Sequence, residues 1–177
     1  MDARLQEMLD HYEITRTLSE YCNACDRCDE GRMAGVYLKD SWDDHGRHKA
    51  TGPEFAKIIT AEILQTTDSL FHMLGQSIIK VDGDQAGAET YFLAVSSSTG
   101  EDGAPLCNQL GGRFVDTLKR EDGRWLIKNR VVVRDWGISL PVERDWTEHV
   151  GLTPGARSNA DPAFKALGMA HGGFRRG

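Results

Sequence analysis

The first 67 residues carry apolar side chains at the three- and four-residue spacing of α-helices. One amphipathic helix is predicted over residues 14–28, and a short helix is predicted over residues 31–38. The polar stretch 39–51 is expected to be a loop or a short strand. A further helix begins at Thr51-Gly52-Pro53-Glu54, where proline suits the first turn. The apolar positions of these helices are Leu5, Met8, Leu9, Tyr12, Ile14, Leu18, Tyr21, Cys22, Cys25, Phe55, Ile58, Ile59, Ile63 and Leu64.

From Ser69 onwards the pattern changes to the alternation that is typical of β-strands. Glycine-containing turns separate four runs, which cover residues 69–82, 86–98, 106–120 and 124–138. Consecutive strands joined by such turns predict an antiparallel meander. Gly111-Gly112 inside the third run indicates a bulge or strong bend, which lets a sheet curl.

Helices followed by a curled sheet predict the α+β class, as a cone-shaped α+β barrel. The N-terminal helices are expected to pack in the concave face of the antiparallel sheet and to leave an apolar cavity there. Residues 1–140 form this single domain. Residues 141–177 are rich in Gly, Pro and Asn, and we expect a tail that packs on the body or a neighbouring subunit, with one helix at 161–167.

The amino-acid composition and net charge exclude some classes of function. The chain has 177 residues, 40% of them hydrophobic, and a net charge of −6 with both signs interspersed. This balance argues against an electrostatic nucleic-acid binder and against a membrane-surface protein. No apolar run reaches membrane-spanning length, and the start lacks the features of a signal peptide. We therefore expect a cytoplasmic protein.

Three of the four cysteines, Cys22, Cys25 and Cys28, follow the spacing of part of an iron–sulfur motif. The nearby fourth cysteine and proline of that motif are missing, and the segment is predicted to be helical. Residues three apart lie near one helix face, so we interpret these cysteines as small buried side chains.

Asp26 and His72 are the principal candidates for chemistry. A carboxylate that orients an imidazole makes histidine a competent general base. Asp26 ends a helix whose neighbouring positions Cys22 and Cys25 indicate a buried face, and a buried carboxylate needs a partner. The two residues lie 46 positions apart, so the hypothesis requires a fold that brings them together.

Other polar residues are weaker candidates. Tyr21 could donate a hydrogen bond to a substrate oxygen, or bond the backbone as a core residue. Trp42 is either packing or an aromatic wall, and Asn108 and Arg130 could line the cavity. A metal could use the donor types in residues 43–48, but we interpret this segment as a solvated polar loop. It contains Asp43, Asp44, His45 and His48.

Several segments resemble the nuclear transport factor 2-like superfamily of cone-shaped α+β barrels, over about residues 5–136. Within it the chain is most similar to the SnoaL-like branch, which holds scytalone dehydratase-like proteins, hexachlorocyclohexane dehydrochlorinases and bile-acid dehydratases. The resemblance implies a cofactor-free lyase with a His–Asp dyad, here His72 and Asp26, and a homo-oligomer with a trimer favoured. The segments that carry it are Tyr21-Cys22-Asn23-Ala24-Cys25-Asp26, Phe71-His72-Met73-Leu74-Gly75, Val81-Asp82-Gly83-Asp84 and Gly123-Arg124-Trp125-Leu126-Ile127.

The chain also departs from these relatives. Scytalone dehydratase uses a second histidine on the next strand, yet residues 85–99 contain none, so scytalone is not the expected substrate. Relatives of the dehydrochlorinase and bile-acid types carry an arginine late in the sheet, and either Arg130 or Arg134 fits that role. Tyr21 resembles the phenol of bile-acid dehydratases. Five residues turn an ideal helix by about 140°, so Tyr21 reaches the cavity of Asp26 only if the helix end distorts.

The sequence therefore predicts a lyase that acts on a small apolar, cyclic or aromatic substrate without metal or cofactor. His72 abstracts the proton, and water is the expected leaving group. An isomerase or polyketide-type cyclase, a C–C lyase of aromatic diols, and a non-catalytic module like the small subunits of ring dioxygenases stay open as alternatives. No phosphate-binding glycine loop, nucleophile elbow or HExxH motif is present in the sequence.

Overall fold

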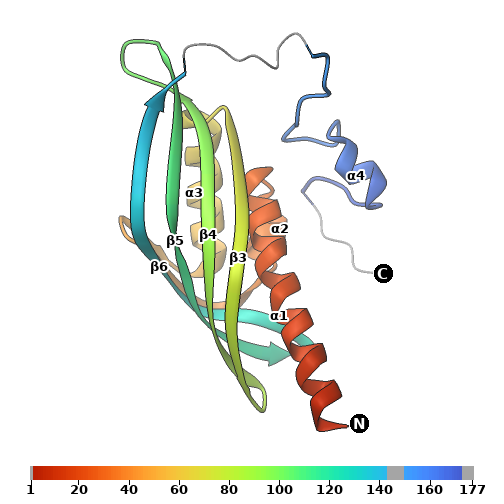
Figure 1. Ribbon diagram of the computed structural model, residues 1–177. Helices are drawn as coiled ribbons and strands as arrows, with labels where there is room; N and C mark the ends of the chain where they lie inside the picture. Colours follow the sequence, from red (N-terminus) through yellow and green to blue (C-terminus); the bar gives the residue numbers. More distant parts are fainter. Residues whose placement is uncertain (1, 143–149, 173–177) are drawn as a thin grey trace.

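The structure, a computed structural model, describes residues 2–142 and 150–172. A long helix and a short one precede a β-hairpin, a third helix follows the hairpin, and four long strands come next (Figure 1). The helices are α1 (Ala3–Asp26), α2 (Glu30–Ala34), α3 (Gly52–Thr66) and α4 (Pro162–Ala166). The strands are β1 (Tyr37–His45), β2 (His48–Ala50), β3 (Ser69–Asp82), β4 (Gln85–Thr99), β5 (Pro105–Glu121) and β6 (Arg124–Pro141).

The strands form one curled, unclosed mixed sheet in the order β2-β1-β6-β5-β4-β3. Strands β3 to β6 pair antiparallel, which confirms the predicted meander. Strand β1 pairs parallel with β6, an addition that the sequence pattern did not predict. The register of β5 on β6 shifts between Gly111 and Gly112, so the expected bulge is confirmed. The fold is the α+β cone that the order of elements predicts.

Local signals explain where the helices begin and end. The carboxylate of Asp2 accepts from the N–H of Arg4 and caps α1. Thr51 and Glu54 form a reciprocal capping box at the start of α3. The short helix predicted over residues 31–38 is wrong at its end, because α2 stops at Ala34 and the next residues begin β1. Within the described residues, no helix combines the length and the apolar character needed to cross a bilayer.

Large apolar side chains fill the space between the helices and the concave face of the sheet. The rings of Phe92 and Phe114 stack there with centroids 4.3 Å apart, and Tyr21 meets Phe114 edge-on at 5.6 Å. Ile14, Leu18 and Phe55 supply the helical side of this core, and each is at most 1% exposed. Burial of these aliphatic and aromatic groups is the main stabilising contribution to the fold.

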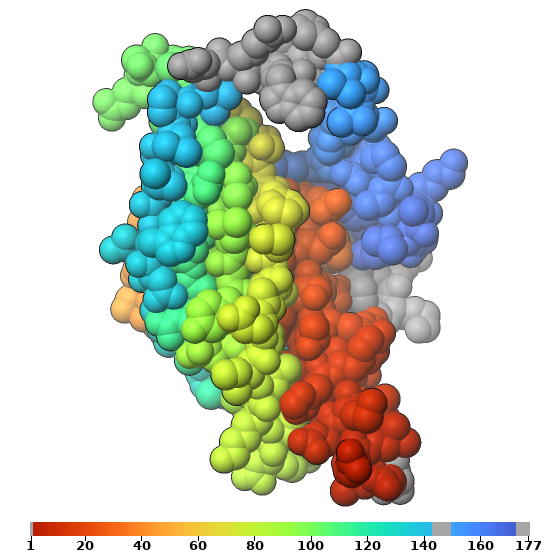
Figure 2. Space-filling view, in the orientation of Figure 1, coloured from red at the N-terminus to blue at the C-terminus, as the bar shows by residue number. Residues whose placement is uncertain are grey.

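The described part of the tail, residues 150–172, packs against the end of α1 (Figures 1 and 2). Arg157 donates to the carbonyl of Thr67 at 2.6 Å, and the His171 ring contacts the carbonyl of Arg27 at 3.0 Å. Phe164 of α4 is buried, which confirms the helix predicted in this segment. Residues 150–172 therefore contact the body of their own chain. Their packing on a neighbouring subunit stays a prediction.

The outer face of the sheet carries exposed apolar side chains. The long strands that carry them lie on the face seen in Figure 2. They alternate with inward-facing residues along β3, β4, β5 and β6. Exposed apolar area of this kind is typical of protein–protein contacts. Self-association through this face stays a prediction. The residues are Phe71, Met73, Tyr91, Val115, Val131, Trp136, Ile138 and Leu140.

Candidate active site

Asp26 and His72 lie in direct contact, although a helix, a hairpin and another helix separate them in the chain. Asp26 is the last residue of α1, and His72 is the fourth residue of β3. The carboxylate Oδ1 lies 2.5 Å from the imidazole Nδ1, and Oδ2 accepts from the His72 backbone N–H at 3.0 Å. The structure therefore meets the condition that the sequence hypothesis set.

These contacts select one tautomer of the neutral imidazole. An ionised carboxylate only accepts hydrogen bonds, so in that tautomer Nδ1 of His72 carries the hydrogen and Nε2 has the lone pair. The side chains of His72 and Asp26 are 10% and 12% exposed, so both are shielded yet reachable. The ring of Phe92, 6.2 Å away, supplies an apolar wall. The arrangement can accept a proton at Nε2 and stabilise the imidazolium that results.

A second histidine–carboxylate pair lies on the β1–β2 hairpin. Nδ1 of His45 contacts Oδ1 of Asp43, and the Tyr37 hydroxyl donates to Oδ2 of Asp43 at 2.5 Å. Asp43 is completely buried, so our interpretation of this segment as a solvated loop is wrong. His48 points elsewhere and contacts Glu62. Among residues 2–142 and 150–172, no group of three or more His, Cys, Asp or Glu side chains is placed to hold a metal.

His45 lies close enough to His72 for their charges to interact. Burial lowers the pKa of His45, the Asp43 carboxylate opposes that shift, and the charges of Arg130 and His72 lower the pKa further. The ring of Phe55 stacks on the imidazole with centroids 4.1 Å apart. The two imidazoles therefore influence each other electrostatically, although the sequence predicts chemistry for His72 alone.

Tyr21 lies in the interior of this site without bonding Asp26 or His72. Its hydroxyl lies 3.2 Å from Nε2 of His45. The side chain is 2% exposed, and burial raises the pKa of the phenol well above its usual range. The phenol therefore stays protonated, and its hydrogen is available as a donor to His45. The expected distortion of the helix end is not needed for this contact.

Arg130 is fully enclosed beside these groups. The strand register sets it between Asp43 on β1 and Asp116 on β5, and its Nε and Nη2 donate to Asp116 at 2.7 and 2.8 Å. The guanidinium lies 4.2 Å from the ring centroid of Tyr21. Nη1 has no hydrogen-bond partner within the described part of the chain. Arg130 therefore offsets the charge of the buried carboxylates, and it makes a cation–π contact with the ring of Tyr21.

The remaining candidates lie apart from the dyad. Asn108 is on the concave face, but its amide already bonds Ser98 and Ser139. Trp42 is 48% exposed on β1, next to the buried Asp43 along a strand whose side chains alternate. It therefore lies on the outer face, and its expected place in a pocket wall is corrected. Arg134 is exposed further along β6.

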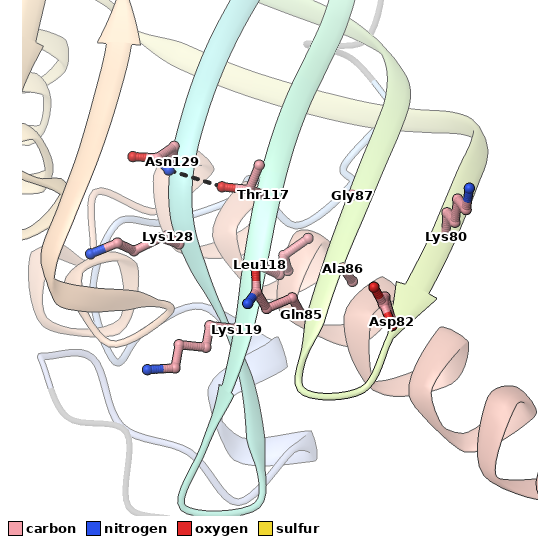
Figure 3. A pocket seen from close by; sticks show the side chains of 10 residues that line it. All are labelled: Lys80, Asp82, Gln85, Ala86, Gly87, Thr117, Leu118, Lys119, Lys128 and Asn129. Carbon is pink, nitrogen blue, oxygen red and sulfur yellow. Dashed lines mark hydrogen bonds between the residues drawn. The ribbon is translucent and has the colours of Figure 1, made fainter.

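A groove of about 350 Å³ adjoins the dyad at Asp26. It lies between the end of α1, the start of β3 and residues 154–161 of the tail, and Leu70, Phe71 and Arg157 contribute to its lining. A larger groove of about 730 Å³ lies near the β3–β4 turn (Figure 3). Its lining includes Lys80, Lys119 and Lys128 but neither dyad residue, so we do not assign the chemistry to it.

Several solved structures have a fold similar to that of this chain. A candidate scytalone dehydratase from Novosphingobium aromaticivorans superposes with a TM-score of 0.67 at 20% identity, over 78% of this chain and 97% of that one. The hexachlorocyclohexane dehydrochlorinase LinA-type3 from Novosphingobium barchaimii gives 0.68 at 16%, over 81% and 97%. The β subunit of a candidate aromatic-ring-hydroxylating dioxygenase from N. aromaticivorans gives 0.59 at 17%, over 73% and 92%.

These similarities show a shared fold. No curated protein matches the chain by sequence. The model of the SnoaL-like domain matches residues 6–131, which is most of the chain and includes both histidine–carboxylate pairs. The chain therefore belongs to the SnoaL-like domain family.

Proposed function

We propose that this protein is a cofactor-independent lyase of the dehydratase type. The observation that carries the proposal is the double contact of Asp26 with His72, through the imidazole and through the backbone N–H. A carboxylate held in this way fixes both the tautomer and the direction of the ring. The substrate is a small, largely apolar molecule with a cyclic or aromatic skeleton.

The reaction begins when Nε2 of His72 takes a proton from a substrate carbon. The electron pair of the broken C–H bond forms the new double bond, and the leaving group departs with its own bonding pair. Asp26 stabilises the imidazolium, which is the role of the carboxylate in other histidine-based sites. In the dehydration that we favour, the departing hydroxide takes the proton back from the imidazolium and leaves as water, which restores the neutral His72. General-base catalysis of this kind contributes about 10²- to 10⁴-fold in rate.

The names of two structural neighbours support this choice of reaction. The dehydratase and the dehydrochlorinase are both named for elimination of a small molecule. Both are at most 20% identical to this chain, so they support a reaction class and leave the substrate open. The apolar rings beside His72 suit a hydrophobic skeleton.

Other outcomes share parts of this site. An isomerase or cyclase would use the same proton abstraction but conserve the substrate mass, and a C–C lyase of aromatic diols would release a carbon fragment. The likeness to a dioxygenase β subunit favours a non-catalytic assembly module as the second candidate function. Such a module would co-purify with a larger subunit and would not depend on His72.

The test is turnover of a panel of hydroxylated and halogenated cyclic and aromatic compounds, with products measured by mass spectrometry. We expect the wild-type protein to convert at least one compound to a product lighter by one molecule of water. His72→Gln is expected to lose this activity, while His11→Gln, a histidine of α1 outside the site, retains it. Full turnover by His72→Gln would reject the proposal, and an unchanged product mass would replace the lyase by an isomerase.

A further inference from the structure

The proposed mechanism uses His72 and leaves the second pair, His45 with Asp43, without a role. In both pairs a carboxylate lies at Nδ1, so each neutral imidazole presents Nε2 as an acceptor. Nε2 of His72 has no hydrogen-bond partner among the described residues. Nε2 of His45 faces the Tyr21 hydroxyl. The site therefore holds two bases, one open and one covered by a phenol.

The hydrogen bond between the Tyr21 hydroxyl and Nε2 of His45 is weak. The Tyr21 oxygen lies 3.2 Å from Nε2, which is long for a hydrogen bond donated by a hydroxyl group. Tyr21 is the donor, because Asp43 holds the other nitrogen in its protonated form. Another hydroxyl group at shorter range could displace it. The Nε2 lone pair that accepts a hydrogen bond from Tyr21 in the free protein can equally accept one from a substrate hydroxyl group.

We propose that His45 is a second catalytic base, which accepts the proton of a substrate hydroxyl group other than the one that leaves as water, and that the substrate therefore carries an alcohol or a phenol besides its leaving group. This inference rests on the proposed lyase function, because it assumes that the substrate lies against His72. It adds to that function a chemical class of substrate. A halogenated hydrocarbon without an O–H group has nothing to donate to His45.

The proton transfer is balanced within the site. The substrate O–H bond breaks, the proton moves to Nε2 of His45, and the electron pair stays on the substrate oxygen. Asp43 balances the imidazolium, with its second oxygen held by the Tyr37 hydroxyl at 2.5 Å. The Tyr21 hydroxyl, released from His45, donates to the new oxyanion, and Arg130 lies 4.2 Å from the Tyr21 ring. The proton returns to the oxygen or to solvent when the product leaves.

Packing around His45 suits this role. The stacked Phe55 ring fixes the plane of the imidazole. Its side chain is 19% exposed, and the carboxylate of its partner Asp43 is fully buried. The charged and titratable groups that act on it are Asp43, Arg130 and His72. Burial, with a smaller contribution from Arg130, holds the pKa of His45 below its usual value, so the imidazole is neutral at neutral pH and its Nε2 lone pair is available.

The test uses 4-nitrophenol as the probe, because its phenolate absorbs at a longer wavelength than the phenol. The spectrum of the bound probe is recorded at a pH where the free probe is largely protonated. We expect bound phenolate with the wild-type protein and with His11→Gln, which changes a histidine of α1 outside the site. We expect the ratio of phenolate to phenol to fall by about tenfold or more in His45→Gln, since one pKa unit is a factor of ten.

A second measurement needs no variant of His45. In ¹⁵N NMR spectra of the wild-type protein, Nε2 of His45 should change from an unprotonated to a protonated shift when 4-nitrophenol binds. An unchanged spectrum, absence of bound phenolate, or phenolate that His45→Gln retains in full would overturn the proposal. Loss of turnover in His72→Gln tests the proposed lyase separately, so either idea can fail without the other.

Discussion

The carboxylate of Asp26 holds His72 at two points, the imidazole Nδ1 at 2.5 Å and the backbone N–H at 3.0 Å. Asp26 is the last residue of α1, where the negative end of the helix dipole disfavours an anion. Hydrogen bonds from His72 offset that cost. The position of Asp26 is therefore electrostatically unfavourable for its helix and is compensated by the contact with His72.

Asp26→Asn should reduce turnover by about 10²- to 10⁴-fold, because an amide cannot stabilise the imidazolium of His72. The change preserves the shape of the side chain, so the KM of the substrate should change little. Steady-state kinetics on the substrate found in the panel measures both quantities. Asp68→Asn, in the lining of the same groove, is the matched control and should retain wild-type turnover. Equal rates for the two variants would contradict the role of Asp26.

Arg130→Met should lower the free energy of unfolding by about 3–5 kcal/mol, because it leaves the buried carboxylates of Asp43 and Asp116 without a cation. The matched control is Arg113→Met, which removes a partly exposed pair with Asp135 and should cost less than about 1 kcal/mol. Urea denaturation of both variants measures the difference. Similar losses would mean that Arg130 does not offset buried charge.

Gly112→Ala should destabilise the protein by about 1–3 kcal/mol, because the new Cβ would lie 2.2 Å from the backbone carbonyl oxygen of Val133. The position is the bulge that bends β5 over the core. Gly87→Ala on β4 places its Cβ in open space and should leave stability nearly unchanged. Thermal denaturation compares the two variants. A stable Gly112→Ala protein would show that the bulge tolerates a side chain.

Acidification should weaken the fold through His45. Burial lowers the pKa of His45 from 6.5, so below about pH 6.5 the unfolded chain binds a proton that the folded protein resists. The free energy of unfolding should therefore fall as the pH drops from about 6.5 to the lower pKa of the folded state. Denaturation midpoints across this range should fall less steeply for His45→Gln. Identical slopes for variant and wild type would contradict a buried neutral His45.

Most of the fold can be predicted from the sequence. Alternation and glycine turns predict the meander of β3 to β6, and Gly111-Gly112 predicts the bulge. The hairpin β1–β2 is predicted only in part, as a loop or a short strand over residues 39–51, because the consecutive exposed residues Lys39 and Asp40 break the alternation of a strand. Its parallel pairing with β6 depends on a contact between distant segments, which local periodicity cannot show.

Only part of the site can be predicted from the sequence, for the same reason. Asp26 and His72 stand at the end of a helix and on a strand that the sequence predicts. Asp43 and His45 share one parity before a turn at Gly46, where φ is +75°, and this spacing could have indicated a hairpin with both side chains on one face. The position of Tyr21 against His45, rather than Asp26, follows from packing that the spacing along α1 does not determine.

The central claim is that His72 removes a proton from a substrate carbon. Single-turnover kinetics with substrate carrying deuterium at that carbon tests it most directly. The account predicts a primary isotope effect in the wild-type protein and a rate at least about 100-fold lower in His72→Gln. A His72→Gln protein that breaks the C–H bond at the wild-type rate would contradict the account.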